Sequence, residues 1–191
     1  NKDNLIGCHN FYPQEFTGLS YSHFAETSQL FKEHNIRTAA FVSSNVATFG
    51  PWPVNDGLCT LETHRYLPIV TQVKHLFATD LIDDVIIGNA YASEEELAAI
   101  IAHECGHYLW AQYIQGRNTI VQERWSDIYS VDLMINAGYN PRYILTMQKK
   151  ILNDFRVQNI SLDVHGTSFA RAEDVKEYIK NLGIANLRSQ A

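Results

Sequence analysis

Hydrophobic residues recur at helical spacing in two stretches of the first half of the chain. Apolar positions three or four residues apart predict helices over about 22–34 and from Pro68 to about 81. An apolar stretch at 36–42 and a β-rich run at 84–91 lie beside them. The first half is therefore expected to be mixed, with helices covering a small sheet.

The second half is dominated by helical patterns. Ser93 to Glu96 form a capping box that opens a helix running to about Gln115. Apolar periodicity, Gly stops and a Pro start predict three further helices, over about 119–138, 141–155 and 170–182. A loop is expected over 156–169.

Length and composition favour one folded domain. The chain has 191 residues, of which 46% are hydrophobic and 12% aromatic, which is enough to build a core. We expect an α+β domain spanning 1–191, with a mixed half at 1–92, a helical half at 93–182 and a tail at 183–191. The Pro- and Gly-rich segment 50–57 is expected to join elements within this domain.

Charge and hydropathy argue against two classes of binding partner for the protein, nucleic acids and the interior of a membrane. Lys and Arg number 15 and Asp and Glu 21, so the formal charge is −6, which argues against nucleic acid as the main partner. No apolar run approaches the roughly 20 residues of a membrane-spanning helix. Neither the compartment nor the oligomeric state follows from the sequence.

A metal-binding pattern lies inside the best-supported helix. His103 and His107 are four residues apart in a His-Glu-x-x-His sequence, so both project from one helical face and can bind one Zn²⁺. Glu104 is rotated about 100° from His103, so it reaches a metal-bound water rather than the metal. Cys105 points away from the two histidines and is not expected to be a ligand.

The following helix supplies the expected third ligand. Glu123 and Asp127 share one face of this helix, four residues apart, and can both face the two histidines. We expect Glu123 to bind the metal and Asp127 to accept the second ring N–H of a ligand histidine. The alternative for this pair is a solvated helix face.

These motifs resemble those of a known enzyme class. His103-Glu-Cys-Gly-His107 followed by Glu123-xxx-Asp127 resembles the gluzincin pattern of zinc metallopeptidases, and residues 123–141 are similar to the family of HtpX, BepA and the CAAX prenyl protease. The resemblance implies a zincin-like fold, with a small mixed sheet packed on the active-site helix. It covers about residues 93–182.

The same resemblance suggests roles for two later residues. His165 and Arg171 have the offset of a late His-Pro-x-x-x-x-Arg motif in that family. His165 would stabilise the oxyanion of the tetrahedral intermediate or occupy the open zinc position. Ordinary roles, as a loop histidine and a helix-start cation, are the alternatives.

The sequence therefore predicts a zinc-dependent metalloendopeptidase that cleaves a protein or peptide substrate. One Zn²⁺ would be held by His103, His107 and Glu123, with Glu104 as general base. An alternative is a zinc-bound regulatory module whose open position is plugged by His165. A third hypothesis shares the chemistry but has a transcriptional regulator as its substrate.

Overall fold

The computed structural model describes residues 5–50, 56–113, 119–145 and 168–183. The chain divides into two compact units, unit 1 from Asn1 to Ser93 and unit 2 from Glu94 to Ala191.

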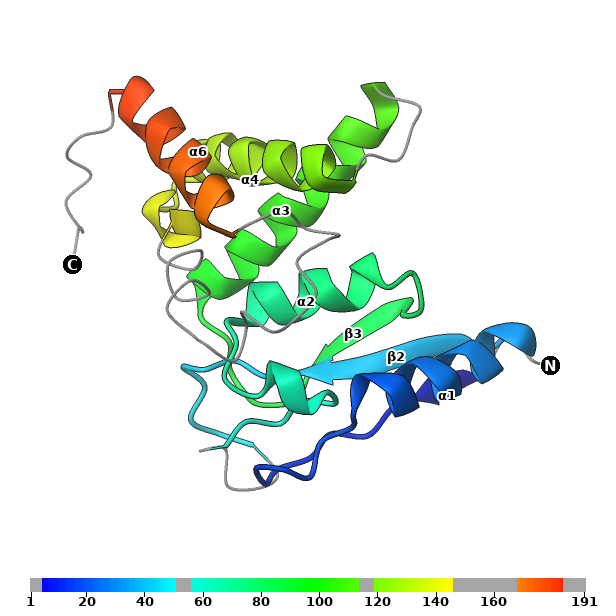
Figure 1. The fold of residues 1–191 in the computed structure, drawn as a ribbon. Coiled ribbons are helices and arrows are strands. Elements are labelled where there is room, and N and C mark those ends of the chain that lie inside the picture. The colour runs from blue at the N-terminus through cyan, green and yellow to red at the C-terminus, as the bar shows by residue number, and fades with distance from the viewer. Residues whose placement is uncertain (1–4, 51–55, 114–118, 146–167, 184–191) are drawn as a thin grey trace. The chain divides into compact units, whose positions relative to one another are not determined.

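Unit 1 is built on a small parallel sheet (Figure 1). Its strands lie in the order β1-β2-β3, and both neighbouring pairs are parallel. Helices α1 and α2 connect successive strands and both contact β2. The elements are β1 (Ile6–Cys8), α1 (Tyr21–Glu33), β2 (Arg37–Val42), the 3₁₀ turn η2 (Glu62–His64), α2 (Ile69–Ala78) and β3 (Asp84–Ile87).

The core of unit 1 centres on β2, which has a neighbour on each side. Ala39, Ala40 and Val42 of this strand are almost fully buried. Central parallel strands are covered on both faces, which explains why the last four residues of this strand, Ala39–Val42, are all apolar. Helix α1 begins where the Ser20 side chain accepts a hydrogen bond from the backbone N–H of His23.

A buried arginine ties two loops of unit 1 together. The Arg65 side chain is 1% exposed and pairs with Glu62 through two hydrogen bonds of 2.8 and 2.6 Å. It also donates to the carbonyl oxygens of Tyr12 and Asp56. Glu62 in turn accepts the backbone N–H of Phe16, so the segment after β1 is fixed to the segment after β2.

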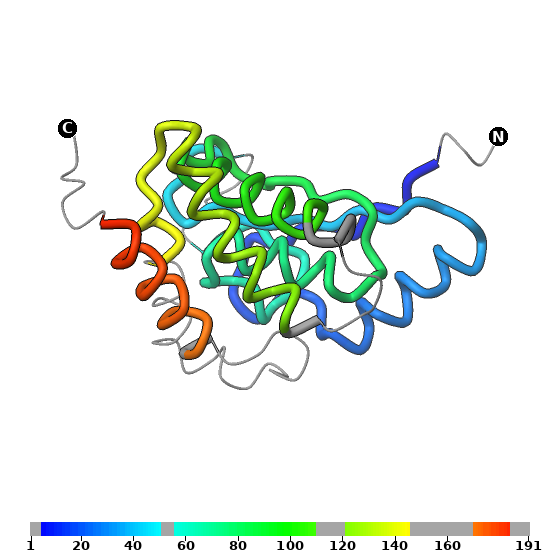
Figure 2. Tube along the Cα trace, turned by 90° about the horizontal axis from the view of Figure 1, so that it is seen from above, coloured from blue at the N-terminus to red at the C-terminus, as the bar shows by residue number. Residues whose placement is uncertain are grey.

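Unit 2 is helical in its described parts. It contains α3 (Glu94–Tyr113), α4 (Thr119–Asn136) and α6 (Ser168–Asn181). Helix α4 packs against both α3 and α6, and Figure 2 shows α6 running alongside α4. None of the helices in the described ranges combines the length and the apolar composition needed to cross a bilayer.

The helices predicted over about 22–34, 68–81, 93–115, 119–138 and 170–182 are confirmed in type and approximate position by α1, α2, α3, α4 and α6. Strand β1 was not predicted, because three residues are too short for a period-two pattern to be recognised. The expected sheet was mixed, whereas the three strands described are all parallel. Residues 156–167 of the expected loop and most of the expected helix over 141–155 lie outside the described residues. Residues 168 and 169, expected at the end of that loop, already belong to α6. The zincin-like arrangement stays a prediction.

Candidate functional site

The three predicted metal ligands lie together in unit 2. His103 and His107 project from α3 and Glu123 from α4, and one ligand atom from each lies within 4.8 Å of the others. The two Nε2 atoms are 3.0 Å apart. His107 Nε2 is 3.2 Å from Glu123 Oε1, and His103 Nε2 is 3.7 Å from Glu123 Oε2. Two imidazole nitrogens and a carboxylate therefore converge on one point.

A glycine allows the two helices to approach at this point. Gly106 lies between the two histidines and faces Ser126 on α4. A Cβ at position 106 would be 2.8 Å from the Cα and 2.9 Å from the carbonyl oxygen of Ser126. Glycine is thus required for the backbone contact that brings Glu123 within reach of the histidines.

Asp127 and Arg171 are buried next to the three predicted metal ligands. His103 Nδ1 lies 3.1 Å from Asp127 Oδ1. The guanidinium of Arg171, on α6, lies 2.8 Å from Glu123 Oε2 and 2.6 Å from Asp127 Oδ2. His103, Asp127 and Arg171 are all at most 5% exposed. Residues from three helices are thereby joined in one buried network.

The charge of Arg171 is stabilised by its two partners. Burial lowers the pKa of the guanidinium, but the carboxylates of Asp127 and Glu123 outweigh that effect and raise the pKa above its ordinary value. A buried charge of this kind is tolerated because it is paired and hydrogen-bonded. Arg171 was predicted as a catalytic residue, and the structure places it against Asp127 and Glu123.

Three other residues considered in the sequence-based predictions are Glu104, Cys105 and His165. Glu104 lies on α3 between the two ligand histidines and is half-buried. Cys105 is a free, exposed cysteine. His165 lies outside the described residues.

A second polar arrangement lies in unit 1, at the carboxyl ends of the strands. Asn89 follows β3 and is 3% exposed. Its Oδ1 accepts the backbone N–H of Ser44 at 2.8 Å, and its Nδ2 donates to the Ser44 carbonyl oxygen at 2.7 Å. Since Ser44 follows β2, this one side chain joins the segments that leave two neighbouring strands.

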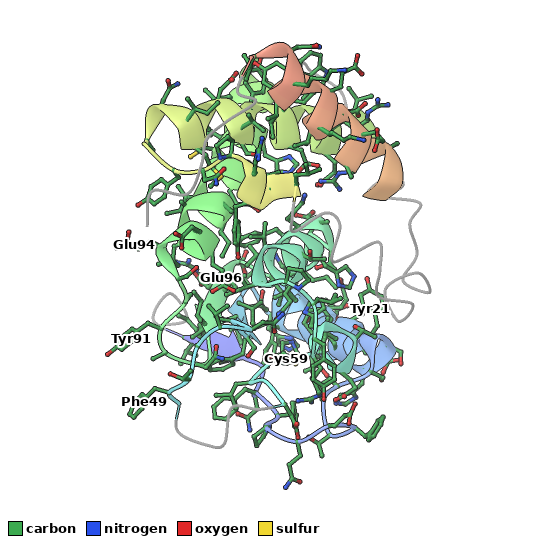
Figure 3. All side chains as sticks on the ribbon, turned by 90° about the vertical axis from the view of Figure 1, so that its left-hand side faces the viewer. Tyr21, Phe49, Cys59, Tyr91, Glu94 and Glu96 are labelled. Atoms are coloured by element: carbon green, nitrogen blue, oxygen red, sulfur yellow. The ribbon has the colours of Figure 1, made fainter. Side chains whose placement is uncertain are left out.

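Two exposed aromatic residues border this arrangement. Phe49 is 70% exposed and Tyr91 is 85% exposed. Phe49 and Ala90 exchange backbone hydrogen bonds, which brings the segments carrying the two aromatic residues together. Figure 3 shows both side chains projecting from the same side of unit 1. Exposed aromatic residues beyond the carboxyl ends of strands are candidates for contact with a ligand.

The end of β1 contributes a buried histidine to the same edge of the sheet. His9 Nε2 is hydrogen-bonded to Ser28 Oγ of α1 at 2.8 Å. Burial, assisted by the nearby His23, lowers the pKa of His9 below its ordinary value. His9 is therefore neutral near pH 7 and acts as a hydrogen-bonding group rather than a cation.

This edge of the sheet was not predicted as a functional site. Its residues come from segments far apart in the chain, and only the parallel pairing of the strands brings them together. One available signal was polar residues within two positions of the end of an apolar stretch, as in Ser43-Ser44 after β2 and Asn89 after β3. Parallel strands place their carboxyl ends at one edge, where ligands of such sheets usually bind.

The comparison with protein families matches all of unit 1 and the start of α3. A family model described as "6-phospho-N-acetylmuramidase, N-terminal" matches residues 1–102. None of the curated proteins matches the chain.

Two solved structures match about half of the chain. The crystal structure of an uncharacterised B. cereus protein is 71% identical over 51% of the chain, with a TM-score of 0.49. A conserved protein of unknown function from Enterococcus faecalis is 30% identical over 52% of the chain, with a TM-score of 0.48. The chain spans 28% of the length of each of these two proteins.

The family match overturns the functional prediction from the sequence. The matched family is named for a glycosidase, so the assignment to the gluzincins, the metalloendopeptidase activity and the protein or peptide substrate are wrong. The zinc module plugged by His165 is not supported either. The resemblance relied on short motifs after residue 93, whereas the family is defined over 1–102. Helical spacing fixes which side chains share a face, but it does not fix the family or the substrate.

Proposed function

Because the chain belongs to the 6-phospho-N-acetylmuramidase, N-terminal family, we propose that it acts on glycosides of 6-phospho-N-acetylmuramic acid. In this proposal the carboxyl edge of the parallel sheet in unit 1 binds the sugar. The proposed substrate is thus a carbohydrate and not the peptide that the sequence motifs suggested.

The observation that carries the proposal is the composition of this edge. Ligands of parallel sheets bind beyond the carboxyl ends of the strands. In unit 1 these ends are joined by the hydrogen bonds between Asn89 and Ser44, so the backbone there is held in place before a ligand arrives. A fixed edge binds a ligand at a lower cost in conformational entropy.

The exposed aromatic residues supply a surface that suits a sugar ring. A pyranose presents C–H groups on its faces and hydroxyl groups around its rim, so its face packs on an aromatic ring. Phe49 and Tyr91 offer such rings next to Ala90. The Tyr91 hydroxyl adds a polar group at the rim of this surface. We therefore assign sugar binding to Phe49 and Tyr91.

Glu62 is assigned a structural role in unit 1, although glycosidases use carboxyl groups. Catalysis of this kind requires one carboxyl group as acid and a second as nucleophile or base. Glu62 is held by Arg65 and accepts the backbone N–H groups of Phe16 and Gly18. The pKa of Glu62 is lowered because these hydrogen bonds and the Arg65 charge outweigh its burial. A carboxyl group that is kept ionised in this way has no proton to donate as a general acid.

Calorimetric titration with 6-phospho-N-acetylmuramic acid tests the proposal. The wild-type chain is expected to bind this sugar more tightly than unphosphorylated N-acetylmuramic acid. Phe49→Ala and Tyr91→Ala should each weaken binding by about tenfold, the amount expected for loss of one aromatic contact. Tyr108→Ala, at a 69% exposed tyrosine of unit 2, is the matched control and should bind as wild type.

A chromogenic glycoside of the same phosphosugar tests the reaction. The proposal predicts release of the chromophore, with a lower rate in Tyr91→Ala and an unchanged rate in Tyr108→Ala. Absence of both sugar binding and release in the wild type would contradict the proposed function.

A further inference from the structure

We propose that unit 2 holds one Zn²⁺ ion, bound by the Nε2 atoms of His103 and His107 and by the carboxylate of Glu123. This site is independent of the sugar-binding edge in unit 1 and goes beyond the proposed glycosidase function. It does not imply cleavage of peptides.

The separations of the three ligands fit a tetrahedral zinc ion. Ligand atoms about 2.0–2.1 Å from Zn²⁺ at tetrahedral angles are about 3.3–3.4 Å from one another. The Nε2 atoms of the two histidines are 3.0 Å apart, Glu123 Oε1 is 3.2 Å from His107 Nε2, and Glu123 Oε2 is 3.7 Å from His103 Nε2. Each separation is within about 0.4 Å of the tetrahedral value. Because the last two end on different oxygens of Glu123, a rotation of this carboxylate would place one of its oxygens on the ion.

The ligands are oriented by residues outside the metal-binding set. Asp127 Oδ1 lies 3.1 Å from His103 Nδ1, the usual place for the carboxylate that fixes the tautomer of a ligand histidine. With the proton on Nδ1, the Nε2 lone pair is directed at the metal position. Arg171 lies against both Glu123 and Asp127, so the two carboxylates are held in place without the ion.

The charges in the network favour a divalent cation. Glu123 and Asp127 are both buried, and Arg171 brings one positive charge to the two carboxylates. Histidine binds a metal in its neutral form, so in the metal-binding form these five side chains carry a net charge of −1. Buried carboxylates are stabilised by cations, and Zn²⁺ is well matched to a set of two imidazoles and one carboxylate.

The site has a route to solvent and a free coordination position. The His107 side chain is 30% exposed, whereas that of His103 is 1% exposed. An ion can therefore enter past His107. Three protein ligands leave the fourth tetrahedral position for water or an oxygen atom of a small anion. Cys105, which follows Glu104, is exposed. It does not lie one helical turn from either histidine, so it does not share their face of the helix.

Metal analysis of the purified full chain, after dialysis against trace zinc, tests the proposal. The wild type is expected to hold about one zinc per chain. His107→Ala and Glu123→Gln should bind almost none under the same conditions, because each lacks one of three ligands. Cys105→Ala is the matched control on the same helix and should retain the zinc.

Two further measurements separate the metal site from a structural role of the same residues. Circular dichroism should show that His107→Ala and the isosteric Glu123→Gln remain folded. Asp127→Asn should lower zinc affinity by about 10–100-fold in a competition titration with a zinc-binding dye. Substitution with Co²⁺ should give the visible absorption of a tetrahedral ion in the wild type and not in His107→Ala.

Three results would overturn the proposal: no zinc in the wild type, equal zinc in wild type and His107→Ala, or zinc lost only in Cys105→Ala. Removal of the metal with EDTA distinguishes this proposal from the proposed sugar-binding function. Sugar binding by unit 1 is expected to be the same with and without EDTA, so either proposal can fail without the other.

Discussion

Gly106 and Ser126 are in backbone contact where α3 crosses α4, since even a methyl group at Gly106 would lie 2.8 Å from the Cα of Ser126. Ser126 is fully buried and lies one turn before Ser130, which is also fully buried. Small residues at a helix crossing let two backbones approach closely. The position of Glu123, one turn before Asp127 on the same helix, depends on this contact.

Gly106→Ala is therefore expected to destabilise unit 2 by about 1–3 kcal/mol, as overpacking does in other cores. The higher helix propensity of alanine, worth about 1 kcal/mol, offsets only part of this strain. Urea unfolding followed by circular dichroism measures the change. Cys105→Ala, at the neighbouring exposed position, should change stability by less than about 0.5 kcal/mol. Equal stability of the two variants would show that α4 can move away without cost.

The cluster in unit 2 was predictable from sequence because most of its geometry is local. Two histidines four residues apart lie on one helical face wherever the helix is placed. Glu123 and Asp127 repeat this spacing on the next helix. The contact of Arg171 with both carboxylates could not be predicted, because it depends on how α6 packs against α4. The family could not be predicted either, since it is carried by residues 1–102, where no short motif was recognised.

Arg171→Met should destabilise unit 2 strongly. The substitution keeps an apolar stem of similar length but leaves Asp127 and Glu123 without their guanidinium partner. Removing one member of a buried ion pair typically costs about 3–5 kcal/mol. Chemical unfolding in the presence of EDTA measures this cost without any contribution from metal.

Lys176→Met is the matched control for this prediction, because Lys176 lies on the same helix and pairs with Glu173 at the surface. An exposed pair of this kind contributes at most about 1 kcal/mol. If the two variants lose similar amounts of stability, the buried network around Arg171 does not stabilise unit 2.

Asn89→Ala should loosen the carboxyl edge of the sheet in unit 1. The substitution removes both hydrogen bonds to the backbone of Ser44, which are buried, and should cost about 1–3 kcal/mol. Asn45→Ala removes an exposed amide that bonds the carbonyl oxygen of Leu67 and should cost less. Amide hydrogen exchange should show faster exchange at Ser44 in Asn89→Ala. Unchanged exchange at Ser44 would mean that this edge is held by other contacts.

The hydrogen bonds between Asn89 and Ser44 could not be predicted from the sequence. Asn89 and Ser44 are each ordinary polar residues after an apolar run, and neither has a distinctive spacing. Their relationship arises because β2 and β3 are adjacent and parallel, with Val42 in register with Ile87. Parallel pairing between distant segments has no short-range signal, in contrast to the helical spacing of His103 and His107.

Glu62 makes the stability of unit 1 depend on pH in the acid range. The pKa of this carboxyl is lowered in the folded chain, because the hydrogen bonds and charge of Arg65 and the N–H groups of Phe16 and Gly18 outweigh its burial. A lowered pKa means that the unfolded chain binds the proton more tightly than the folded chain. The stabilisation by Glu62 is therefore complete above its ordinary pKa of 4.5 and is lost as the pH falls through the lower folded value.

Glu62→Gln should remove this part of the pH dependence. The variant is expected to be less stable than wild type at pH 7, with a difference that shrinks as the pH falls below 4.5, the ordinary pKa of the carboxyl. Urea unfolding at a series of pH values, monitored by tryptophan fluorescence, measures both curves. Glu26→Gln, at an exposed position of α1, should run parallel to wild type. A constant difference between Glu62→Gln and wild type at every pH would mean that the Glu62 carboxylate contributes shape and hydrogen bonds but not charge.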